Sequence, residues 1–138
     1  MYKRQVRCAN CHRYGGRGAK TGPELTGIGA RISRRRVLDS LLRPSQEIAP
    51  RYVPTLIEMS DGRVIQGIWQ GYVVQSRMDR YQLADGSIME IDPGQVETSQ
   101  QSPVSIMPEG LHQRLTINEI RDLLELLHEV PKAANERR

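Results

Sequence analysis

The chain is poor in aromatic residues and in cysteine. It has no phenylalanine, and Phe, Trp and Tyr together make up 4% of its 138 residues. A core of this size usually contains more aromatic bulk, so the composition is compatible with a large buried prosthetic group. Two cysteines are too few for a disulfide scaffold. No apolar run reaches membrane-spanning length, and the length indicates one domain, or one domain with an insertion.

Charge is distributed unevenly along the chain. Residues 1–51 contain 12 Lys and Arg against 3 Asp and Glu, whereas residues 52–138 contain 8 against 13. A basic half of this kind can bind nucleic acid, dock an acidic protein or offset the carboxylates of a prosthetic group. Nucleic acid is disfavoured, because the sequence has neither zinc-finger spacing nor interleaved basic and aromatic residues.

Three regions follow one another in the sequence. Residues 1–51 are expected to be loop-rich around one short helix, which Ser33 caps and Pro44 ends. Residues 52–98 predict four or five antiparallel strands, with Asp-Gly turns at 61–62 and 85–86 and bends or bulges at Gly67 and Gly71. A polar loop is expected at 99–110. A final helix should begin at a capping box formed by Thr116 and Glu119 and end at Pro131.

The motif that indicates a cofactor is C-x-x-C-H, formed by Cys8, Cys11 and His12. This spacing is typical of covalent c-type haem attachment. One helical turn can place both thiols along one porphyrin edge, where they form thioethers, and the histidine can then ligate the iron from the same side. The sequence therefore predicts one covalent haem c.

Two other sites could use the same residues. A redox-active C-x-x-C does not need the following histidine and is expected in a βαβ setting, which this sequence lacks. A structural zinc site needs four ligands, usually from two close pairs. Here the second pair would have to be His112 and His128, whose separation of sixteen residues is unusual. Haem attachment is the favoured interpretation.

The residues after His12 resemble the loop that follows the attachment site of class I c-type cytochromes. The resemblance lies in Gly18–Arg31, with the sequence GAKTGPELTGIGAR. It implies that the Pro23 carbonyl accepts a hydrogen bond from the ligand imidazole, that Leu25 packs on the haem face and that Arg31 reaches a propionate. A plain turn proline is the alternative for Pro23.

The candidates for the sixth iron ligand are five methionines and two further histidines. Met107 is favoured because class I cytochromes place the axial methionine in a loop ahead of the C-terminal helix. Met1 is terminal, Met59 and Met89 are expected in strands and Met78 in a turn. His112 stays open as a candidate but is more typical of a solvated loop, and His128 is expected at the helix surface. The predicted metal ligands are therefore His12 and Met107.

The resemblance implies an α+β fold with a mainly α-helical class I cytochrome c core. Residues 1–138 would form a single domain, and residues 52–98 would be a small antiparallel β-sheet inserted between the haem loop and helix and the axial-methionine loop. The whole pattern is also similar to a narrower family, the haem-binding domain of planctomycete and verrucomicrobial bacteria. Matching segments include residues 8–12, 22–31, 48–52 and 105–111.

These resemblances imply an electron carrier rather than an enzyme. His/Met ligation saturates the iron and favours electron transfer. Redox partner proteins, including a dehydrogenase domain and a respiratory acceptor, would dock to it, and the sheet could mediate a homodimer. The domain would be periplasmic or otherwise exported, with a leader or upstream domains absent from this chain. The alternative function is a haem enzyme or a gas or redox sensor with a labile sixth ligand.

Overall fold

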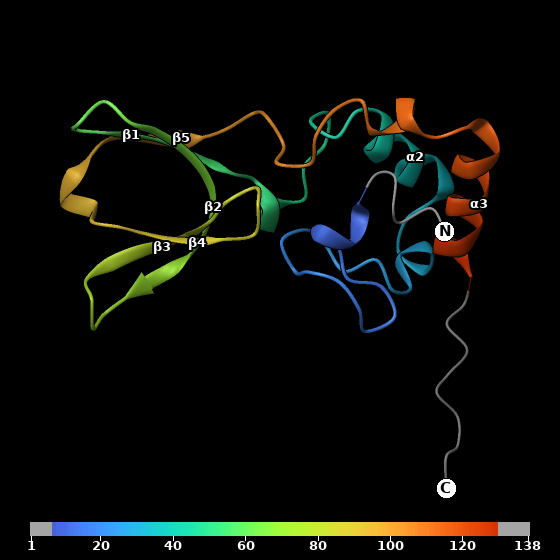
Figure 1. Cartoon of the computed structure of the whole chain (residues 1–138), viewed down its shortest axis with the longest axis horizontal. Helices are drawn as coiled ribbons and strands as arrows, with labels where there is room; N and C mark the ends of the chain where they lie inside the picture. The colour runs from blue at the N-terminus through green and yellow to red at the C-terminus, as the bar shows by residue number, and fades with distance from the viewer. Residues whose placement is uncertain (1–6, 130–138) are drawn as a thin grey trace, which may run out of the picture.

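The computed structural model describes residues 7–129, which form a β-sheet and a helical part lying side by side (Figure 1). The sheet contains β1 (Thr55–Met59), β2 (Val64–Val73), β3 (Met78–Gln82), β4 (Ile88–Ile91) and β5 (Val96–Gln101). The helical part contains α2 (Arg34–Leu42) and α3 (Ile117–His128), together with short 3-10 turns. Chain segments on both sides of the sheet in sequence meet in this helical part.

The sheet is antiparallel, with its strands in the order β4-β3-β2-β1-β5. The Asp-Gly turns lie in the β1–β2 and β3–β4 connections, as the sequence predicts. The β2–β3 register shifts between Trp69 and Gly71, where Gly71 has a φ of 124°. This is the expected bulge at Gly71, whereas Gly67 pairs regularly with Thr55.

The fifth strand occupies residues that the sequence assigned partly to a loop. β5 pairs with β1 from Thr55↔Gln101 to Met59↔Val96. Its residues after Val96 are polar and exposed, because β5 lies at an edge of the sheet. Residues 99–101 therefore look like a loop in sequence, and the prediction of a loop there is wrong.

The buried core of the structure lies in the sheet. Ile57, Met59, Tyr81 and Ile91 form one cluster, against which Ile65, Met89 and Val96 pack. In the helical part, Leu41 and Leu127 are the buried large apolar side chains among the described residues. Many other apolar side chains of that part are half-buried: Leu25, Ile28, Ile32, Val37, Leu38, Ile106, Leu111, Leu115, Ile120, Leu123 and Leu124.

Both α-helices begin with the caps that their sequences predict. The Ser33 side chain accepts a hydrogen bond from the Arg36 N–H, which satisfies a free donor at the start of α2. Thr116 and Glu119 form a reciprocal capping box at the start of α3. The end of the last helix at Pro131 lies outside the described residues.

The prediction of a mainly α-helical class I cytochrome c core is wrong. About 30% of the described residues are helical, 3-10 turns included, and 26% are in strands. The two α-helices have 9 and 12 residues, and the largest regular element is the five-stranded sheet. The glycine-rich segment between His12 and α2 forms turns, in which several glycines adopt positive φ, and one short 3-10 helix, η2 (Ile28–Ala30).

Two organisational predictions have different outcomes. None of the helices within residues 7–129 is long and apolar enough to cross a membrane. The interpretation of residues 52–98 as an insertion into a single domain stays a prediction. The strands themselves run from Thr55 to Gln101.

Candidate cofactor-attachment site

The C-x-x-C-H residues form one tight turn. A 3-10 helix, η1, spans Cys8–Asn10, and the N–H groups of Cys11 and His12 both donate to the Cys8 carbonyl, at 3.1 and 2.8 Å. Arg7, with a φ of 52°, starts this turn in the left-handed region. The turn brings the two cysteines and the histidine together without a longer helix.

The His12 ring is oriented by a backbone carbonyl. His12 Nδ1 lies 2.8 Å from the Pro23 oxygen. A carbonyl can only accept, so Nδ1 carries the proton and donates it, which leaves the Nε2 lone pair for a metal. This is the contact that the resemblance implied. Pro23 therefore orients the His12 ring and is not a plain turn proline. The iron-ligand role of His12 stays a prediction.

Two glycines allow the loop to lie directly on the motif. A Cβ on Gly22 would lie 2.7 Å from His12 Cε1 and 3.0 Å from Nδ1. A Cβ on Gly18, whose φ is +109°, would lie 2.1 Å from the His12 carbonyl oxygen. The sequence places both glycines in the segment that resembles the cytochrome loop, but it assigned neither of them a contact with His12.

Three backbone hydrogen bonds fasten the loop along the motif. They join the N–H groups of Ala19, Gly22 and Leu25 to the carbonyls of Ala9, Cys11 and Arg13, at 3.0, 2.7 and 2.9 Å. The structure thus brings together residues 8–13 and 19–25 as one unit, with Leu25 half-buried within it.

Arg31 is exposed, and its Nη2 donates to the Glu24 carbonyl at 3.1 Å. This contact holds the guanidinium beside the loop that carries Pro23. The packing of Leu25 on a haem face and the reach of Arg31 to a propionate stay predictions.

The two thiols are half-buried, and no disulfide joins them. Burial raises the pKa of the Cys11 thiol. A redox-active C-x-x-C is expected in a βαβ setting. The described residues contain no βαβ unit, because every strand pair of the sheet is antiparallel and both cysteines lie outside the sheet.

A zinc site also lacks support within residues 7–129. No group of three or more His, Cys, Asp or Glu side chains in that range is arranged to hold a metal ion. His128 Nδ1 instead faces the Leu124 carbonyl, at 2.8 Å, one helical turn back.

Met107 lies in the loop between β5 and the 3-10 helix η5 (Leu111–Arg114) and is half-buried. Its N–H donates to Ser105 Oγ at 3.1 Å, and the Ser105 N–H donates to Ser45 Oγ at 3.0 Å. These contacts attach the methionine loop to the turn after α2. They do not attach it to the His12 loop, so the axial role of Met107 stays a prediction.

The helix α3 packs closely on the loop that follows the site. A Cβ on Gly29 would lie 2.5 Å from His128 Cα, which shows how near the backbones approach. Tyr14 Oη donates to the Leu126 carbonyl at 3.3 Å and so links the motif segment to the same helix.

The predictions of solvated histidines are wrong. His128 and His112 are both half-buried. His128 Nε2 and His112 Nδ1 are buried without a hydrogen-bond partner in the described part of the chain. At His128 the cause is a tertiary contact, because Gly29 lets the backbone of the loop before α2 approach this histidine closely. The helical spacing of the sequence does not reveal that contact.

Comparison of the sequence with protein-family models and with curated proteins finds no match.

Proposed function

We propose that this chain is an electron-transfer domain carrying one haem c, attached through Cys8 and Cys11 and ligated by His12. The observation that carries the proposal is the 2.8 Å contact from His12 Nδ1 to the Pro23 carbonyl. It fixes the tautomer whose Nε2 can bind iron, and such a hydrogen bond raises the basicity of the ligand. Gly22 allows the loop to lie against this ring, because a Cβ at that position would be 2.7 Å from His12 Cε1.

The apolar residues of the helical part also fit a haem. Most apolar side chains of the helical part are half-buried, whereas the compact core lies in the sheet. A large flat apolar group would cover the exposed area of these side chains. Fully burying one such side chain stabilises a protein by about 1.5–3 kcal/mol. When bound, the haem supplies a one-electron couple between ferrous and ferric iron.

The protein residues have distinct parts in this function. Cys8 and Cys11 hold the cofactor covalently, and His12 is oriented by Pro23. Met107 provides the sixth ligand in our proposal, which saturates the iron and disfavours chemistry on small ligands. We therefore assign the domain as an electron carrier rather than an enzyme.

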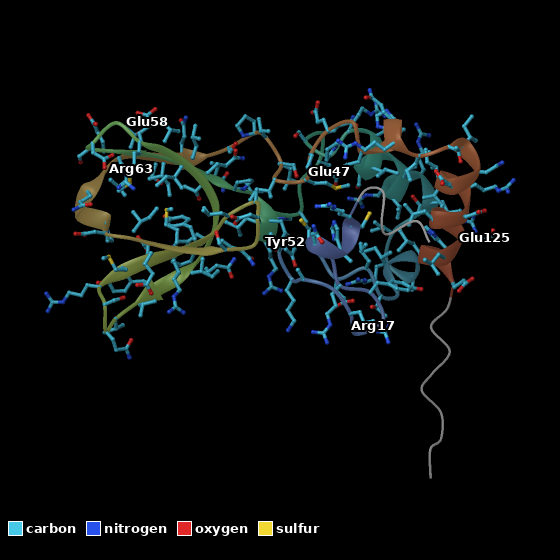
Figure 2. The ribbon with its side chains drawn as sticks, viewed as in Figure 1. Arg17, Glu47, Tyr52, Glu58, Arg63 and Glu125 are labelled. Carbon is cyan, nitrogen blue, oxygen red and sulfur yellow. The ribbon has the colours of Figure 1, made fainter. Side chains whose placement is uncertain are left out.

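The proposed partners are redox proteins in an exported compartment, since thioether attachment of haem resembles a process performed outside the cytoplasm. Arg17 and Lys20 are exposed on the loop after the motif, and Arg17 projects from that loop in Figure 2. Exposed cations at this position favour docking of an acidic donor, such as a dehydrogenase domain, or an acidic acceptor.

The test is expression together with a c-type haem maturation system, followed by a pyridine haemochrome spectrum and a mass measurement. We expect one haem per chain with two saturated thioether links. The Cys8→Ala/Cys11→Ala double variant should lose covalent haem. A parent protein that carries no covalent haem under these conditions would refute the proposal.

The ferric spectrum separates the carrier from the alternative of a haem enzyme or sensor. A low-spin spectrum with a sulfur-to-iron charge-transfer band, lost in Met107→Ala, supports the carrier. High-spin iron that binds carbon monoxide readily in the parent protein would instead support a labile sixth position.

A further inference from the structure

The β3–β4 turn of the sheet contacts the loop that carries Pro23. Thr21 is 3% exposed, and its Oγ1 accepts a hydrogen bond from Gln82 Nε2 at 3.4 Å. The same Nε2 lies 3.5 Å from the Gly86 carbonyl, and a Cβ on Gly86 would lie 3.3 Å from Thr21 Oγ1. Figure 1 shows this end of the sheet facing the helical part. The Thr21 side chain is therefore enclosed by the turn.

Thr21 immediately precedes the residues that touch His12. Gly22 donates its N–H to the Cys11 carbonyl at 2.7 Å, and the Pro23 carbonyl accepts from His12 Nδ1 at 2.8 Å. The loop is thus held on one side by the motif and on the other by the sheet. Because Thr21 is only two residues before Pro23, a displacement of Thr21 would also move the Pro23 carbonyl.

We propose that Gln82 and the β3–β4 turn position the Pro23 carbonyl on His12, and so set the electron-donating strength of the imidazole. Gln82 is a positioning residue, because it acts through Thr21 and touches neither His12 nor the cofactor site directly. The part of this inference that concerns potential rests on the proposed haem function. The part that concerns the position of His12 does not.

The physical consequence has a definite sign. A firm hydrogen bond from Nδ1 to a carbonyl makes the imidazole a stronger donor, which favours ferric over ferrous iron. Loosening the loop weakens that bond, so the reduction potential should rise. The Gln82 bonds of 3.4 and 3.5 Å are long, and their loss should loosen the loop without unfolding it.

The experiment uses Gln82→Met, which keeps the side-chain length but removes the donor, and Thr21→Val, which keeps the shape but removes the hydroxyl. Thr21→Ser restores the hydroxyl and should behave like the parent. The control is Gln70→Met, because Gln70 lies on β2 and its Nε2 faces the Ile68 carbonyl of its own strand.

The first measurement is the reduction potential of the haem-loaded proteins. We expect Gln82→Met and Thr21→Val to shift the ferric-to-ferrous equilibrium toward ferrous iron by about twofold to tenfold, a tenfold shift being about 59 mV. Thr21→Ser and Gln70→Met should match the parent. Equal potentials in all five proteins would overturn the proposed tuning.

The second measurement is hydrogen exchange of the His12 Nδ1–H by NMR, in the reduced haem-loaded protein or, if the isolated protein carries no haem, in the protein as isolated. We expect faster exchange in Gln82→Met and Thr21→Val than in the parent and in the two matched variants. Unchanged exchange would overturn the positioning role. If the parent carries no haem, the proposed function fails while this measurement still decides whether the turn holds the loop.

Discussion

Replacing Gly22 with alanine tests the central contact of the site. The new Cβ would lie 2.7 Å from His12 Cε1, and the Gly22 N–H is already bonded to the Cys11 carbonyl at 2.7 Å. The loop can make room only by stretching that bond or the Pro23 contact. Overpacking costs about 1–3 kcal/mol, and one weakened hydrogen bond adds about 1 kcal/mol. We expect Gly22→Ala to lower the free energy of unfolding by about 2–4 kcal/mol.

The assay is urea unfolding of the haem-loaded protein, followed by circular dichroism. The matched control is Gly94→Ala, because the nearest atom to its Cβ would be Asp92 Oδ1 at 3.3 Å, a contact that a shift of a few tenths of an ångström relieves while Oδ1 keeps its bond from the Gly94 N–H. We expect Gly94→Ala to lower the free energy of unfolding by less than about 1 kcal/mol. A Gly22→Ala protein within about 0.5 kcal/mol of the parent would show that the loop does not press on His12.

Three further predictions concern the elements around the site. Gly29→Ala should cost about 1–3 kcal/mol in the same unfolding assay, because its Cβ would meet the His128 backbone, which cannot rotate away. Thr116→Ala should cost about 0.5–2 kcal/mol by removing the capping box of α3, and an unchanged unfolding midpoint would contradict the cap. Hydrogen bonds from Ser87 hold the pKa of Asp85 below its usual range, so the associated stability is present above the unfolded pKa and is lost as pH falls through the folded pKa. Asp85→Asn should remove this pH-dependent part of the stability. Urea titrations at a series of pH values measure it.

The local features of the fold were predictable from sequence because neighbouring residues determine them. Ser33 and Thr116 cap helices through their own side chains. The Asp-Gly turns lie between strands where the sequence places them. The contact between His12 and Pro23 joins residues eleven apart, and it was the resemblance of the loop to class I cytochromes that implied it.

The features that sequence reasoning missed depend on tertiary contacts. β5 is recognisable as a strand only through its pairing with β1, since its exposed residues are polar. His128 is covered because Gly29 allows a close backbone approach. The hydrogen bond between Gln82 and Thr21 joins residues 61 apart, and neither residue type has a distinctive pattern. The expectation of a mainly helical fold failed because the attachment motif, the Gly18–Arg31 loop and the last helix were extended to the architecture of a whole family, whereas the five-stranded sheet is the largest regular element.

The same distinction separates the two halves of the proposed iron site. Attachment and proximal ligation use residues within one turn and its adjoining loop, so a five-residue motif can indicate them. The sixth ligand depends on where a distant loop is fastened, and Met107 is held there by the hydroxyls of Ser105 and Ser45. Serine hydroxyls make such contacts in many loops and carry little positional information in sequence. Under this proposal, attachment and ligation by His12 are encoded locally, whereas the sixth ligand, and with it the choice between carrier and sensor, is encoded by the tertiary fold.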